Sequence, residues 1–185
     1  MKSIKFFAFA IAAFLTVSTV VYLNSCTTDK CKNVTCNNGG TCTDGTCNCT
    51  TGYEDATCST EMRTKFLVSG SFTESGHTDS SWNSSSHTST TTYAIAITKG
   101  SNVNSILIGN LGNYNFTTGS YNVPATMTSS TTFTFTNQII AGTTFNGSGS
   151  IAAGKVSISY VAVYPDNTSG HTNKTVTDTY TAVQN

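Results

Sequence analysis

The residues with the clearest chemistry in this sequence are seven cysteines, all of which lie between Cys26 and Cys58. Cysteine thiols form disulfides, ligate metals, act as nucleophiles or carry lipid. An odd number of cysteines in an exported protein requires a separate fate for one of them. If Cys26 carries a lipid, the other six can pair completely, and no free thiol remains for catalysis.

The amino-terminal segment has the pattern of an export signal. Lys2 and Lys5 precede an apolar run from Phe6 to Leu23, and a positive start followed by an apolar stretch is typical of secretory leaders. An uncleaved membrane anchor is the alternative, because the run is close to the minimum spanning length of about 17 residues.

The end of this run, Leu23-Asn24-Ser25-Cys26, resembles the lipobox of bacterial lipoproteins. In that motif an aliphatic residue stands three positions before the cysteine and a small residue directly before it, although Asn24 departs from the commoner choice. The resemblance implies that residues 1–25 are a cleaved signal peptide and that Cys26 becomes the lipid-bearing first residue. Two or more acyl chains, such as palmitate, contribute about 0.8 kcal/mol per buried methylene and give stable membrane binding. We therefore expect an exported protein, anchored to the bacterial outer membrane and exposed at the surface, with residues 26–30 as its tether.

The other six cysteines fall within residues 31–58, a segment too short to build a hydrophobic core without cross-links. Their spacing alone does not choose among the many possible pairings. The run Cys36-Asn37-Asn38-Gly39-Gly40-Thr41-Cys42, the step Cys47-Asn48-Cys49, and Thr51-Gly52-Tyr53 before Cys58 resemble an EGF-like module. This resemblance covers residues 31–58 and implies the disulfides Cys31–Cys42, Cys36–Cys47 and Cys49–Cys58. Its expected role is a stiff spacer between the lipid and the following domain.

Metal binding is the alternative use of these cysteines. Closely spaced cysteines ligate zinc, but an oxidising compartment and the lack of a nearby histidine favour disulfides. The segment Thr28-Asp29-Lys30 does not reproduce the acidic pattern that calcium-binding EGF-like modules carry around the first cysteine. We expect no metal and no cofactor.

The remainder of the chain has the composition of extracellular β structure. Charged residues make up only 10% of the chain, and nine Lys and Arg balance nine Asp and Glu, so no basic field is present to attract nucleic acid. Residues 59–65 form a short charged linker. From residue 66 onward apolar and polar residues alternate in short runs, most clearly at Val156, Ile158, Tyr160 and Ala162, which is the pattern of half-buried strands.

Turn-forming residues separate these runs, so neighbouring strands are expected to pair as hairpins. We predict a mainly β protein in which residues 66–185 form an antiparallel up-and-down meander of about eight strands, closed as a barrel or folded as a sandwich. The strand order and the hairpin from Gly147-Ser148-Gly149 to Tyr160 are distantly similar to those of lipocalin-like barrels of bacterial surface lipoproteins. The predicted turns are Lys99-Gly100-Ser101-Asn102, Thr118-Gly119, Ala141-Gly142 and Ala152-Ala153-Gly154.

The motif Gly147-Ser148-Gly149 could be taken for a phosphate-binding loop. Such loops require a following helix, whereas a strand pattern follows here. The glycines therefore predict close strand packing or a bulge.

Two polar stretches are the candidate binding loops. The first, Glu74 to Thr92, contains His77, Asp79, Trp82 and His87, and the second, Pro165 to Lys174, contains His171. His and Asp can bind a metal, and an exposed Trp can stack on a sugar ring. A solvated loop with its Trp folded over one end of the barrel is the simpler interpretation.

Nothing in the sequence predicts an enzyme. Three histidines without ligand spacing do not form a catalytic zinc site. Glu74 and Asp79 could be a glycosidase pair, but a Ser-rich loop would give them no rigid scaffold. Nucleophile-elbow and zinc-protease motifs do not occur.

The leading hypothesis is a non-enzymatic surface lipoprotein whose β domain binds a glycan or protein partner. A second hypothesis is a carrier that holds a small apolar ligand inside the barrel, although the many inward Phe, Ile and Tyr residues would more simply fill it. A third is a eukaryotic secreted EGF-containing protein, in which sequons such as Asn115-Phe116-Thr117 would carry glycans.

Overall fold

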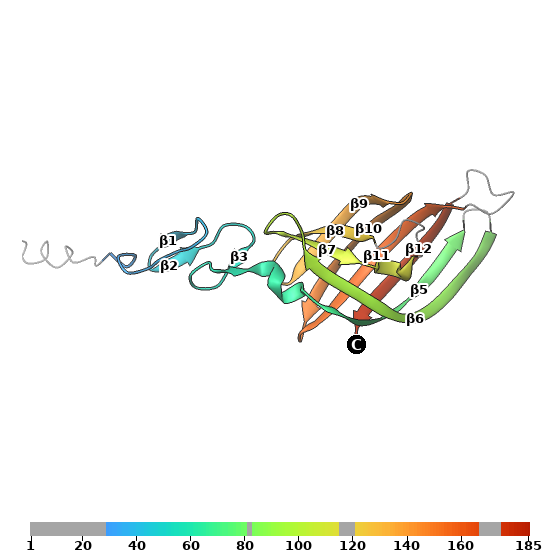
Figure 1. Cartoon of the computed structure of the whole chain (residues 1–185), viewed down its shortest axis with the longest axis horizontal. Coiled ribbons are helices and arrows are strands. Elements are labelled where there is room, and N and C mark those ends of the chain that lie inside the picture. Colours follow the sequence, from blue (N-terminus) through green and yellow to red (C-terminus); the bar gives the residue numbers. More distant parts are fainter. Residues whose placement is uncertain (1–28, 81–82, 115–120, 167–174) are drawn as a thin grey trace, which may run out of the picture.

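The computed structural model describes residues 29–80, 83–114, 121–166 and 175–185. They form a small cysteine-rich segment followed by an eight-stranded β domain (Figure 1). The leader with Cys26, and likewise Trp82, Thr118-Gly119 and His171, lie outside the described residues.

The cysteine-rich segment is built from two small hairpins and three disulfides. Strands β1 (Thr41–Thr43) and β2 (Thr46–Asn48) pair through a two-residue turn in which Asp44 (φ 51°) and Gly45 (φ 86°) both have positive φ, as a tight hairpin requires. Strands β3 (Tyr53–Glu54) and β4 (Thr60–Glu61) form the second hairpin. The disulfides are those implied by the EGF-like resemblance, namely Cys31–Cys42, Cys36–Cys47 and Cys49–Cys58.

An Asp side chain organises the second hairpin. Asp55 has positive φ (78°) and its carboxylate accepts hydrogen bonds from the backbone N–H groups of Thr57 and Ser59 and from three hydroxyls, those of Thr57, Ser59 and Thr60. These donors, the Thr60 hydroxyl first among them, hold the pKa of Asp55 well below its usual range. The carboxylate therefore closes the Cys49–Cys58 loop as an ionised acceptor.

Residues 59–65, predicted as a linker, have regular structure of their own. They contain β4 and most of the 3-10 helix η1 (Met62–Phe66). Phe66 at the end of η1 is fully buried and packs edge-on against Phe133, with ring centroids 5.3 Å apart. The end of η1 thus enters the hydrophobic core.

The predicted β meander is present and is closed as a barrel. Strands follow one another around it in chain order, all antiparallel, and β12 returns to pair with β5. The strands are β5 (Ser69–Ser80), β6 (Asn83–Lys99), β7 (Ser105–Gly109), β8 (Asn122–Met127), β9 (Thr132–Ile140), β10 (Thr143–Ala152), β11 (Lys155–Pro165) and β12 (Thr175–Gln184). A short 3-10 helix, η2 (Leu111–Asn113), follows β7.

The predicted turns within the described residues lie between strands. The pairs Ala141-Gly142 and Ala153-Gly154 connect β9 to β10 and β10 to β11, and all four residues have positive φ. Residues 100–104 connect β6 to β7. The alternation of apolar residues matches the side chains that fill the barrel, because every second residue of a strand points inward.

The glycines of Gly147-Ser148-Gly149 lie within β10 and allow close packing, as expected from the sequence. A Cβ on Gly149 would lie 2.1 Å from the Phe133 ring, and one on Gly147 would lie 2.5 Å from the Ser159 carbonyl oxygen. The register of β10 against β9 also shifts between Phe145 and Gly147, which identifies a bulge.

The predicted long loop from Glu74 to Thr92 is instead a hairpin. Strand β5 continues to Ser80 and β6 begins at Asn83, so only two residues connect them. The hairpin extends to the end of the barrel remote from the cysteine-rich segment (Figure 1).

Candidate binding groove

The predicted loop residues are divided between two faces of the β5–β6 hairpin. His77 and Asp79 share the outward face of β5, where His77 Nε2 lies 3.1 Å from an Asp79 carboxylate oxygen. His87 of β6 is directly opposite Thr78, whose hydroxyl bonds the buried Asp178 inside the barrel. Because side chains directly opposite each other share a face, His77 and His87 are placed on opposite faces.

This arrangement does not bring His77, Asp79 and His87 together on one face. Among residues 29–80, 83–114, 121–166 and 175–185, no three His, Cys, Asp or Glu side chains lie close enough to hold one ion. Within that same part of the chain, no helix is long and apolar enough to cross a membrane.

The barrel interior contains two carboxylates that the sequence did not single out as interior groups. Glu74 is 3% exposed and accepts hydrogen bonds from the hydroxyls of Tyr93 and Tyr160. Asp178 is 5% exposed and accepts from the hydroxyls of Thr78 and Tyr114. Burial, with a smaller contribution from the Asp178 charge, raises the pKa of Glu74.

These buried polar groups are hydrogen-bond partners within one cluster. The Tyr93 hydroxyl donates to Glu74 and accepts from the Gly112 N–H (2.8 Å), while Tyr180 shares its hydroxyl with Thr78 and Ser89 at 3.0 Å each. Burial is the main cause that raises the pKa values of Tyr93 and Tyr160, so both stay protonated as donors. We interpret the cluster as a buried hydrogen-bond network that fixes the interior.

A surface groove of about 580 Å³ runs across β7, β8 and β9 on the outside of the barrel. It lies where the barrel wall is weakly paired. Only two residue pairs, Thr126–Thr134 and Met127–Phe133, join β8 to β9, whereas five pairs join β8 to β7.

Pro124 explains the short β8–β9 ladder. The Met127 N–H donates to the Asn104 carbonyl on the β7 side, and the Tyr121 carbonyl accepts from Asn110 on the same side. Since backbone groups alternate along a strand, those of Pro124 face β9. Proline has no N–H to donate, so the ladder stops beside Thr126.

On the β9 side of the groove, a side chain replaces the missing ladder hydrogen bond. The carbonyl of Thr136 lies in the part of β9 beyond the ladder and accepts a hydrogen bond from Gln138 Nε2 at 2.9 Å. The outward side chains of Thr126, Thr134 and Thr136 are exposed along the groove. These contacts give an open surface with hydroxyl and amide groups already in place.

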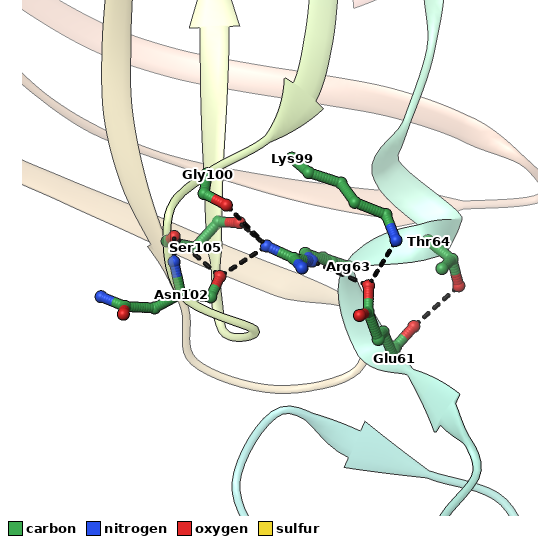
Figure 2. A network of polar contacts seen from close by, with 7 residues as sticks. All are labelled: Glu61, Arg63, Thr64, Lys99, Gly100, Asn102 and Ser105. Atoms are coloured by element: carbon green, nitrogen blue, oxygen red, sulfur yellow. Dashed lines mark hydrogen bonds and ion pairs between the residues drawn. The ribbon is translucent and has the colours of Figure 1, made fainter.

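One end of the groove is held by the junction with the cysteine-rich segment (Figure 2). Arg63 of η1 is 8% exposed, and its Nη1 lies 2.9, 2.5 and 3.3 Å from the carbonyl oxygens of Gly100, Asn102 and Ser105. Gly100 and Asn102 belong to the β6–β7 connection and Ser105 begins β7, and all three line the groove.

Charged groups complete the junction. The Glu61 carboxylate accepts hydrogen bonds from Arg63 Nε at 2.9 Å and from Lys99 Nζ at 2.8 Å. These bonds, with that of Arg63 as the larger cause, lower the pKa of Glu61 to about 2. Lys65 pairs with Glu54 of the second hairpin at 2.7 Å. Charge-assisted bonds thus join the cysteine-rich segment to the barrel, since η1 residues bond to both parts and Glu61 of β4 bonds to Lys99 of β6.

Sequence reasoning missed the groove and placed the candidate site at the opposite end of the barrel. The signal that could have indicated it is Pro124 within the alternating run Val123 to Met127, because proline inside a strand marks an edge or an interruption. Comparison with protein-family models, curated proteins and solved structures finds no match to this chain.

Proposed function

We propose that this protein is a non-enzymatic, lipid-anchored protein of the bacterial cell envelope that presents a β-barrel for adhesion or partner binding. In this proposal Cys26 carries the lipid, residues 31–58 are an EGF-like spacer, and the barrel carries the binding surface. The lipobox-like run and the odd cysteine support the anchor, since the six remaining cysteines are paired. The three disulfides indicate an extracellular or exported protein.

The observation that carries the proposal is the Arg63 junction. A spacer has to hold the barrel at a defined position relative to the anchor, and a flexible linker would not do so. Here the disulfide-linked segment is tied to the barrel by the buried Arg63 guanidinium and by the contact of Gly52 with Val103, where an added Cβ would lie 2.7 Å from Val103 Cγ1. The two parts therefore act as one stiff unit, as a mount requires.

The interior chemistry favours this proposal over an apolar-ligand carrier. At the end near η1 the interior holds large buried side chains such as Phe66 and Phe133. Farther along, the described interior holds the buried Glu74 and Asp178 carboxylates with their tyrosine hydroxyls. An apolar ligand there would have to displace hydrogen bonds among buried polar groups, which costs free energy.

Anchoring and display are tested on intact cells that produce the full chain. Labelled palmitate should be incorporated into the wild-type protein and not into the Cys26→Ser variant, which should leave the membrane fraction. Protease added to the cells should remove the barrel of the wild-type protein from the surface. Lipid incorporation into Cys26→Ser, or a barrel that resists protease until the cells are broken, would contradict the proposal.

A further inference from the structure

The β7–β9 groove has the chemistry of a site for an uncharged, hydroxyl-rich ligand. No charged side chain is among the described residues that line it. Its polar groups include the hydroxyls of Thr126, Thr134 and Thr136 and the amides of Asn102 and Gln138, and apolar surface comes from Leu107 and Pro124. Hydroxyls and amides both donate and accept hydrogen bonds, which matches the hydroxyls of a sugar ring.

The groove is continued by a row of outward hydroxyls that crosses strand after strand. Thr134 lies opposite Thr126 on one side and Ser148 on the other, and Ser148 lies opposite Ser159. The register extends the row to seven residues on seven strands: Thr126, Thr134, Ser148, Ser159, Thr181, Ser75 and Thr90.

A second hollow lies next to the groove along this row. Its volume is about 200 Å³, its lining includes Ser148, Ser150, Ser157 and Ser159, and it shares Thr134 with the groove. A ligand longer than one ring could therefore leave the groove across Thr134 and remain in contact with hydroxyls. The groove itself falls within the range of about 300–1,000 Å³ that is typical of ligand sites.

An extended peptide is the other occupant to consider, because peptides can add a strand to an exposed sheet edge. The edges here are poorly suited to strand addition. Pro124 offers no N–H on the β8 side, and the Thr136 carbonyl on the β9 side is already occupied by Gln138. Main-chain pairing, the source of affinity in that mode, is thus blocked at the centre of the groove.

We infer that the β7–β9 groove binds a neutral oligosaccharide, with Thr126, Thr134, Thr136 and Gln138 as hydrogen-bonding groups. This inference rests on the proposed function and specifies its ligand class and site. The hydroxyl row provides the direction in which a longer glycan extends. The β6–β7 connection, held by Arg63, provides the fixed end.

The test compares two Thr→Trp substitutions in the full chain. Thr136→Trp places a large side chain in the groove. Thr179→Trp is the matched control, because Thr179 is an exposed outward threonine of β12 that lines neither described hollow. Both variants are first checked for wild-type thermal unfolding. Binding is then measured by calorimetry to neutral oligosaccharides of glucose, galactose, mannose and N-acetylglucosamine, with uronic-acid oligosaccharides as the charged comparison.

The expected result is binding of at least one neutral oligosaccharide, weakened tenfold or more by Thr136→Trp and unchanged by Thr179→Trp. Equal binding by the two variants would show that the glycan binds elsewhere and would overturn the assignment of its site to the groove. Binding of none of the neutral set at millimolar concentration, or binding of the charged set alone, would overturn the ligand class. Neither failure would decide the proposed function, because lipid incorporation and surface display are measured separately.

Discussion

The two parts of this chain are held together by different physical means. The cysteine-rich segment has few buried side chains and depends on three disulfides and on hydrogen bonds such as those of Asp55. The barrel contains no disulfide among its described residues and depends on a continuous apolar core. Small size forces the first solution, since a short segment cannot bury enough surface, while the barrel can. The comparison predicts that each part can be damaged without loss of the other.

Removal of a core aromatic should have the largest effect, and that effect should be confined to the barrel. Phe133 is fully buried against Phe66 and Phe135, so Phe133→Ala should lower the free energy of unfolding by about 3–5 kcal/mol. Denaturant unfolding measures this cost. Ile139→Ala is the control on the same strand, because Ile139 is 69% exposed. A similar cost for both variants would show that the core does not dominate barrel stability.

Loss of one disulfide should damage the other part. The double variant Cys49→Ser/Cys58→Ser opens a loop with a sequence separation of 9, which should cost about 2–3 kcal/mol through the entropy of the unfolded loop. Hydrogen exchange should show faster amide exchange in residues 49–61, with unchanged protection in β10 and β11. If barrel amides lose protection to the same extent, the two parts unfold as one unit and the comparison fails.

The Arg63 junction is the place where the comparison can be sharpened, because it belongs to both parts. Arg63→Met leaves the carbonyls of Gly100, Asn102 and Ser105 without their charged donor, at a cost of about 1–3 kcal/mol. Small-angle scattering should detect a broader range of orientations between the segment and the barrel. Lys99→Met is the control, since it removes a 51% exposed partner of Glu61 and leaves Arg63 in place. An unchanged scattering profile for Arg63→Met would mean that other contacts set the orientation.

The smallest expected effect concerns the barrel interior and depends on pH. Because the pKa of Glu74 is raised above its ordinary value of 4.5, the ionised form weakens the folded state, and this penalty is absent below pH 4.5 and grows as pH rises through the folded-state pKa. Glu74→Gln should therefore raise the melting temperature by a few degrees at neutral pH and by less as the pH is lowered toward 4.5. A pH-independent gain for Glu74→Gln would indicate a packing effect instead.

The features predicted from the sequence are those that depend on local pattern. Alternating apolar residues predicted an antiparallel meander of about eight strands, and the positive-φ pairs Ala141-Gly142 and Ala153-Gly154 occupy the expected turns. The β5–β6 hairpin was predicted as a loop because its inward residues are polar. Glu74, Gly76 and Thr78 replace the apolar residues that normally reveal a strand, and they do so because the interior at that end is a hydrogen-bond network.

The groove could not be predicted from the alternation of residues, because it depends on the direction in which one backbone position faces. A proline at residue 123 or 125 would have removed a donor toward β7, and only the register shows that Pro124 faces β9. Likewise, the spacing of Arg63 from Gly100 and Ser105 in the sequence gives no indication that they meet. The β5–β6 hairpin brings them together, because it pairs Ser69, just after η1, with Ala96 near the end of β6.

The Arg63 junction also has a mechanical consequence. A pull on a ligand held in the groove would load the β6–β7 connection, and from there the force would pass through the guanidinium and η1 into the disulfide-linked segment. Load that the ligand places on Thr134, Thr136 or Gln138 of β9 reaches this path most directly across the two residue pairs that join β8 to β9. That seam is therefore where the barrel wall would carry the tension that a tethered protein experiences when its ligand belongs to a moving surface.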